Sequence, residues 1–218
     1  MFSAKHFFEN LHISCMCEKD SISVFITNES RTSFEGKLTV LFESTSGAHG
    51  MRAEKSVFVR AFSSAGVMKL PFSSAGRRNK IFIARLADED GKVVSESRII
   101  LCENNELELF DPQLRFETVL RAGRVYVTVS AEKYARYVEL SCREETGDFS
   151  ENYFDLCAGE SKTVELLNPC AGLEEMIAVR SLFSVLEHRN KSRDKKRLLS
   201  VASKPAVIAN VVGRILGD

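Results

Sequence analysis

The sequence predicts an all-β protein with two tandem immunoglobulin-like β-sandwiches, the second smaller, followed by a short C-terminal helical tail. Apolar and polar residues alternate in short runs, for example at 22–27 and 125–129. A period of two indicates strands that bury one face. Turn signals such as Ser46-Gly47 and Ala122-Gly123 separate these runs, and few helical patterns lie between them. Many short strands at regular spacing favour a sandwich over an α/β barrel.

The first half of the chain contains seven such segments, a complete set for an immunoglobulin-like domain. Asp90-Gly91 gives the clearest hairpin signal, because it lies between two apolar runs. The repeated sequence Ser-Ser-Ala-Gly, at Ser63–Gly66 and Ser73–Gly76, predicts turns on either side of one strand. The expected strands lie near residues 11–15, 22–28, 35–43, 54–60, 66–71, 79–87 and 93–102.

A polar stretch at 103–106 and the pair Asp111-Pro112 predict a linker, since the residue before proline favours extended backbone. We therefore expect domains at 1–105 and 106–187 and a separate tail at 188–218. The strands expected in the second domain lie near residues 114–120, 124–130, 136–142, 152–156 and 162–167.

Two segments near the end of the sequence depart from clear alternation. Residues 175–186 fit either a strand, through Ile177 and Val179, or a helix, through the apolar residues at 182, 183 and 186. A second helix is expected from Pro205, because proline suits the first helical position. Its apolar stripe has the spacing of one helical face and comprises Ile208, Val211, Val212, Ile215 and Leu216.

Composition argues against several classes of protein. Of the 218 residues, 44% are hydrophobic and 28% charged, which is typical of a globular chain. Thirty basic residues balance thirty acidic ones, so no overall field attracts nucleic acid or a membrane. The basic run 189–197 lacks the interleaved aromatic residues of base-stacking surfaces and is interpreted as a solvated linker. No secretory signal is recognised, and no cofactor is expected.

The six cysteines are expected to be reduced and structural. A chain of this length can build a hydrophobic core without disulfide bonds, and the cysteine spacing is irregular. Cys142 and Cys157 neighbour apolar strand residues, where a free cysteine acts as a small hydrophobe. Cys15 and Cys17 form C-x-C, one residue short of the C-x-x-C of zinc and redox sites. We therefore expect neither a disulfide nor a metal, and reduced cysteines favour a cytoplasmic location.

Three stretches carry a family resemblance. Residues 149–166 read F-S-E-N-Y-F-D-L-C-A-G-E-S-K-T-V-E-L, residues 2–8 read F-S-A-K-H-F-F, and the strand at 22–29 ends in Thr-Asn-Glu. Together they resemble the C-terminal immunoglobulin-like domains of β-mannosidases of glycoside hydrolase family two, whose last domain carries a run F-S-D-N-x-F-D-L-x-P-G-E-x-K-T-V. Ala158 stands where the family often has proline. The resemblance favours a final strand within 175–186.

The resemblance implies a non-catalytic accessory portion of an enzyme that removes terminal β-D-mannose. In such an enzyme a jelly-roll domain and a (β/α)8 barrel precede the sandwiches, which brace the barrel by intramolecular packing. The catalytic glutamates belong to the barrel, so no catalytic residue is assigned in this chain. Asn28-Glu29 and Asn105-Glu106 match the family's Asn-Glu acid/base pair superficially, but they lie at a strand end and in the linker.

The rival interpretation is a stand-alone immunoglobulin-like module that binds a protein partner or a carbohydrate. With no tryptophan in the chain, the candidate sugar platform consists of Tyr126, Tyr134, Tyr137 and Tyr153. The four histidines, which no serine or cysteine elbow motif accompanies, are His6, His12, His49 and His188. Separated from a barrel, the chain is expected to self-associate through Phe2, Phe7 and Phe8 or through the stripe at 208–216.

Overall fold

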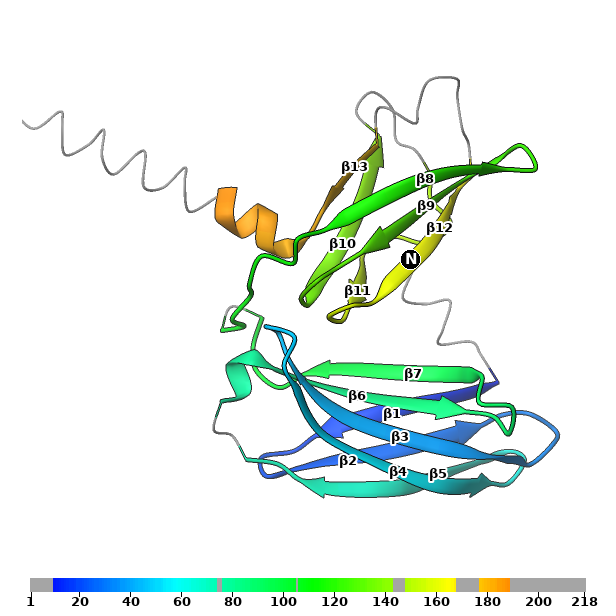
Figure 1. Cartoon of the computed structure of the whole chain (residues 1–218). Coiled ribbons are helices and arrows are strands. Elements are labelled where there is room, and N and C mark those ends of the chain that lie inside the picture. Colours follow the sequence, from blue (N-terminus) through cyan, green and yellow to red (C-terminus); the bar gives the residue numbers. More distant parts are fainter. Residues whose placement is uncertain (1–9, 74–75, 105, 143–147, 168–176, 189–218) are drawn as a thin grey trace, which may run out of the picture.

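The computed structural model describes residues 10–73, 76–104, 106–142, 148–167 and 177–188. They form two β-sandwiches joined by an extended linker (Figure 1). The described helical structure is limited to the 3-10 turn η2 (Arg77–Asn79) and to residues 182–188. The predicted all-β class with two sandwiches is therefore confirmed. None of the described helices is long and apolar enough to cross a membrane.

The first sandwich contains seven antiparallel strands in two sheets. One sheet has the order β1-β2-β5 and comprises β1 (Leu11–Cys17), β2 (Ser21–Asn28) and β5 (Ser63–Pro71). The other has the order β4-β3-β6-β7 and comprises β3 (Phe34–Ser44), β4 (His49–Val59), β6 (Lys80–Ala87) and β7 (Val93–Ile100).

The alternation in the sequence decides which side chains fill this first core. On β2, Ile22, Val24 and Ile26 are fully buried, and the neighbouring side chains point to the opposite face. Leu38 and Val40 of β3 face them from the second sheet. Burying an aliphatic side chain of this size contributes about 1.5–3 kcal/mol, so the two facing rows account for the pairing of the sheets.

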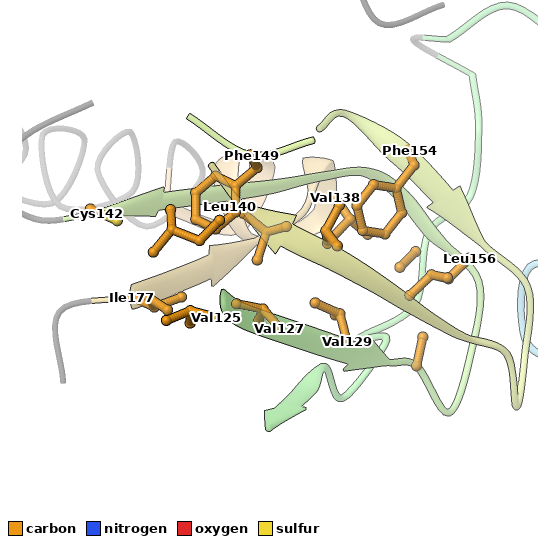
Figure 2. Packing of buried hydrophobic residues seen from close by; sticks show 14 residues of the cluster. Val125, Val127, Val129, Val138, Leu140, Cys142, Phe149, Phe154, Leu156 and Ile177 are labelled. Atoms are coloured by element: carbon orange, nitrogen blue, oxygen red, sulfur yellow. The ribbon is translucent and has the colours of Figure 1, made fainter. Parts of the chain in front are cut away.

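The second sandwich has two three-stranded sheets. One has the order β12-β9-β8 and comprises β8 (Arg115–Arg121), β9 (Arg124–Ser130) and β12 (Ser161–Leu166). The other has the order β11-β10-β13 and comprises β10 (Ala135–Cys142), β11 (Phe154–Leu156) and β13 (Ile177–Arg180). Figure 2 shows Val125, Val127 and Val129 of β9 pointing at Val138 and Leu140 of β10 across a compact apolar core.

The structure confirms one of the turns predicted from glycine residues and contradicts another. Gly91 has a φ of +79° and closes the β6–β7 hairpin, as Asp90-Gly91 predicts. The interpretation of Ser63–Gly66 as a turn is wrong, because these residues begin β5 and pair with β2 from Asn28 to Phe25. A register shift between Val24 and Phe25 lies beside Gly66, so this glycine marks a β-bulge rather than a turn.

The segment near residue 180 combines both expected conformations. Ile177–Arg180 forms β13 against β10, as alternation and resemblance predict, and residues 182–188 are helical. The helix therefore begins where the helical spacing of Leu182, Phe183 and Leu186 does. The helix expected from Pro205, the basic run 189–197 and the aromatic residues Phe2, Phe7 and Phe8 lie outside the described residues.

Five of the six cysteines are described, and all five are free thiols. Cys142 and Cys157 are buried, whereas Cys17 is exposed. Burial raises the pKa of the Cys15 thiol to about 11 and also raises the pKa of Cys157. Because the thiolate is the reactive form, these buried thiols resist alkylation in the folded protein.

This pattern gives a labelling prediction. At pH 8, iodoacetamide should modify Cys17 well before Cys15, Cys142 or Cys157, and peptide mass spectrometry would record the order. Thiol titration in denaturant without reductant should find six free thiols. A shortfall, or early labelling of Cys157, would contradict this account of the cysteines.

Candidate functional site

The stretch 149–166 is built around side chains that replace or reinforce strand pairing. Phe149, Phe154 and Leu156 fill the core of the second sandwich. The amide of Asn152 accepts the N–H of Leu140 at 2.8 Å and donates to its carbonyl at 2.9 Å. Asn152 thus pairs with β10 in the way a strand backbone does, which satisfies both polar groups of Leu140.

Asp155 anchors the beginning of β10. Its Oδ2 accepts a hydrogen bond from the Tyr134 hydroxyl at 2.5 Å and lies 3.3 Å from Arg136 Nη1, while its Oδ1 accepts the N–H of Tyr137 at 2.9 Å. Burial raises the pKa of Tyr134, and the neighbouring Asp155 charge raises it further, so this hydroxyl acts as a donor. One carboxylate therefore fixes two side chains and one backbone N–H at the start of β10.

A network of ion pairs joins the two sandwiches. Glu160 of the second sandwich contacts Arg85 and Arg98 of the first, with 2.9 Å between Arg98 Nη1 and Glu160 Oε2. Glu96 of β7 pairs with the same two arginines. Burial opposes the charge of Glu96, but hydrogen bonds and charges from Arg98 and Arg85 outweigh it and lower its pKa. The four groups are each only 20–30% exposed, so solvent screens them less than it screens surface pairs.

An apolar cluster completes the contact between the sandwiches. Tyr134 and Cys157 of the second sandwich pack with Leu41, Ile81 and Ile83 of the first. Ile81 and Ile83 point away from the first core, yet both are fully buried. Strand β6 is therefore covered on both faces, once by its own sandwich and once by its neighbour.

The linker and one turn also belong to this contact. Leu107 is buried in the same cluster, and the N–H of Glu108 donates to the carbonyl of Arg78. Gly47, in the β3–β4 turn, has a φ of +93°, and a Cβ there would lie 3.0 Å from the Cβ of Ala158. Both the backbone angle and this close approach favour glycine. The linker is thus anchored at Leu107, which packs with residues of both sandwiches.

Beside the ion pairs lies a groove of about 640 Å³ that both sandwiches line. Residues of strand β7 form one wall, and residues of β10, β11 and β12 with the loop before β11 form the other. Tyr137 and Tyr153 lie on the second wall with 42% and 55% of their surface exposed. The other lining residues are Val93, Val94, Ser95, Glu96, Arg98, Glu151, Phe154, Asp155 and Lys162.

The first Asn-Glu pair that matches the acid/base motif by sequence has a structural residue and an exposed one. Asn28 is buried, and its amide donates to the carbonyls of Thr32, Val59 and Arg60, so it stabilises the turn after β2. Glu29 beside it is exposed.

The other candidate pair lies in the linker. Glu106 lies 3.5 Å from Arg77 and 3.8 Å from Arg78, while Asn105 is outside the described residues. Among the histidines, His12 lies in β1, and His49 is exposed at the start of β4, 3.8 Å from Glu43. His188 lies in the helical residues, and His6 is not described.

The four candidate tyrosines separate into three environments. Tyr134 is buried between the sandwiches, Tyr126 lies on the outer face of β9, and Tyr137 and Tyr153 line the groove. The structure therefore brings two of the four together.

Sequence reasoning missed the residues that join the sandwiches, above all Arg98, Asp155 and Glu160. One signal in the sequence indicates that both faces of β6 are covered. Residues 81–84 read Ile-Phe-Ile-Ala, and a continuous apolar run indicates a strand buried on both sides. The partners of Arg98 in the second sandwich had no such signal, because they are 57–62 residues away in sequence and meet it only in the folded protein.

Two protein-family models match the chain in succession. Residues 20–103 match the mannosidase Ig/CBM-like domain, and residues 109–185 match the Ig-fold domain found in mannosidases. These two ranges follow the two sandwiches of the structure. No curated protein sequence matches the chain.

Solved structures show the same fold at low sequence identity. The β-D-mannosidase of Dictyoglomus thermophilum superposes with a TM-score of 0.70 and 14% identity, over 83% of this chain and 22% of that one. The exo-chitosanase CsxA of Amycolatopsis orientalis superposes with a TM-score of 0.55 and 20% identity, over 75% of this chain and 24% of that one. The chain thus spans less than a quarter of either enzyme. The chain carries a mannosidase Ig/CBM-like domain followed by an Ig-fold domain of the kind found in mannosidases.

Proposed function

We propose that this chain is the non-catalytic accessory portion of a β-mannosidase-like glycoside hydrolase and that it braces a catalytic barrel of an enzyme that removes terminal β-D-mannose. The observation that carries the proposal is the succession of the two mannosidase-type domains along the chain. The domain boundaries that we propose lie near residues 105 and 187, with a separate tail beyond.

The contact between the sandwiches supports a bracing role. A brace has to resist rotation of its parts, and this contact combines a desolvated cluster around Tyr134 with the ion pairs of Glu160. Interfaces that are large and apolar fix domains relative to each other, whereas small polar ones leave them mobile. The packed linker at Leu107 adds to the same restraint.

The chemistry of the groove also supports a non-catalytic role. Glycoside hydrolysis needs an acid and a base or nucleophile, two carboxyl groups about 5–10 Å apart beside the sugar. Here Glu96 is held by two arginines, Glu151 by Lys162 and Asp155 by Arg136. For Glu96 this pairing lowers the pKa, whereas a general acid requires a raised one.

The bracing role predicts an effect on the stability of the barrel. The reading frame that contains this chain should encode a (β/α)8 barrel upstream. Deleting both sandwiches from that protein should shorten the half-life of its β-mannosidase activity on heating about tenfold, which is the effect of about 1.4 kcal/mol on the barrier to inactivation. The KM for an aryl β-mannoside should stay the same, because the sandwiches do not contribute to the sugar site of the barrel.

The control is deletion of residues 189–218 alone, which should leave the half-life unchanged. An upstream frame without a barrel would favour the stand-alone module. A deletion that raises KM without altering the half-life would show that the sandwiches shape the sugar site of the barrel and do not brace it.

A further inference from the structure

The groove between the sandwiches contains two tyrosine rings that the structural contacts leave accessible. Tyr137 and Tyr153 are both more than 40% exposed, although they line a groove in which Phe154 beside them is only 7% exposed. The buried Tyr134 donates its hydroxyl to Asp155. The hydroxyls of Tyr137 and Tyr153 also have partners, Arg136 and Glu139, yet much of each ring stays exposed at the groove, where flat aromatic faces serve ligand binding.

The backbone holds these two rings in unusual conformations. Tyr137 and Tyr153 have φ values of +49° and +59°, in the left-handed region that bulky residues rarely adopt. Asp155 accepts the N–H of Tyr137, and Asn152 accepts the N–H of Tyr153. Strain of this kind, of order 1–3 kcal/mol per residue, persists where the surrounding structure fixes it and gathers at ligand sites.

Side-chain contacts orient the rings further. The guanidinium of Arg136 lies 4.2 Å from the centroid of the Tyr137 ring and covers one of its faces. The hydroxyl of Tyr153 donates to Glu139 at 3.2 Å. Each ring therefore has restricted rotation before any ligand arrives, which lowers the entropy cost of binding.

The charged lining groups are paired with one another. Arg98 contacts Glu96 and Glu160, Lys162 contacts Glu151, and Asp155 contacts Arg136. Because these lining charges are paired, the groove offers many hydrogen-bond donors and acceptors. It offers no unpaired charge that would attract an ionic ligand. Hydroxyl groups, which donate and accept at once, suit this lining.

From these features we propose that the groove binds a neutral oligosaccharide, which stacks on Tyr137 and Tyr153 and directs its hydroxyl groups toward Arg98, Asp155 and Lys162. The flat face of a pyranose ring is apolar at its C–H bonds, and its edge carries hydroxyls, so it matches both parts of the lining. This site does not depend on the proposed bracing role, since it belongs to the two sandwiches alone.

The test is titration of the whole chain with β-1,4-linked mannotetraose by isothermal calorimetry. Binding in the millimolar range or tighter is expected. Tyr153→Ala and Tyr137→Leu should each weaken it at least tenfold, because both remove a flat ring. Tyr137→Phe should retain the affinity within about twofold, since it keeps the ring and loses only the hydroxyl. Tyr126→Ala, on the outer face of β9, is the matched control and should bind as the unaltered chain does.

Three results would overturn the proposal. The first is no heat or saturation-transfer NMR signal with 10 mM tetrasaccharide. The second is binding that Tyr153→Ala and Tyr137→Leu leave unchanged while both variants keep the far-ultraviolet spectrum of the parent. The third is preference for a cationic glucosamine oligomer that disappears at high salt, which would indicate an ionic site. None of these results bears on the stability of a barrel, so failure here leaves the bracing role standing.

Discussion

Replacing Tyr134 with alanine should lower the free energy of unfolding by about 3–5 kcal/mol, the range for removing a large buried aromatic side chain. Tyr134 is 1% exposed and lies in the cluster that joins the two sandwiches. The substitution leaves a cavity against Ile81 and Ile83 and removes the hydrogen bond to Asp155. Urea unfolding followed by circular dichroism would measure the change.

Two further variants separate the effect of the cavity from the effect of the lost hydrogen bond. Tyr134→Phe keeps the ring and should cost about 1–3 kcal/mol, because it removes the shortest of the three hydrogen bonds that Asp155 accepts. Tyr126→Ala, a partly exposed tyrosine of the same domain, should cost well under half as much as Tyr134→Ala. If Tyr134→Ala unfolds with the same free energy as Tyr126→Ala, the contact described between the sandwiches is wrong.

Replacing Glu160 with alanine should cost about 1–3 kcal/mol, because it leaves two partly buried arginines with one carboxylate between them. It also removes the acceptor of the Cys157 N–H, at 3.0 Å. Because Glu160 lies in one sandwich and both arginines in the other, the two should then unfold less cooperatively. Differential scanning calorimetry should show one transition in the unaltered chain and a broadened or split transition in the variant.

Glu132→Ala is the control for that measurement. Glu132 pairs with Arg115 at 2.6 Å, but both side chains are largely exposed and lie in one sandwich. Exposed pairs contribute about 0.2–1 kcal/mol, so this variant should retain a single sharp transition. Two separate transitions already in the unaltered chain would mean that the sandwiches do not stabilise each other.

The strands were predictable because their signal is local. On β9 the buried side chains alternate with less buried ones, and on β2 the small Ser23 is the one departure from this alternation, which the sequence records directly. The error at Ser63–Gly66 has the same origin. Small residues carry little information about burial, so a β-bulge beside Gly66 could not be distinguished from a turn.

The site was less predictable because its partners meet only after folding. Asp155 and Glu160 lie in the stretch that carries the family resemblance, but nothing in that stretch says that Glu160 contacts Arg85, 75 residues earlier. The exposure of Tyr137 and Tyr153, and the burial of Tyr134 against Ile81 and Ile83 of β6, likewise depend on how the sandwiches pack. Composition identified the tyrosines, and only tertiary structure separated their roles.

The central proposal is that this chain is an accessory part of a glycoside hydrolase and does no chemistry itself. Its most direct test is incubation of the purified chain with p-nitrophenyl β-D-mannoside, with a β-mannosidase that contains its barrel as the positive control. We predict no release of nitrophenol above the rate of the buffer. Turnover by the chain that Glu96→Gln, Glu151→Gln or Asp155→Asn abolishes, in a variant that remains folded, would contradict the claim and place an active site in the groove.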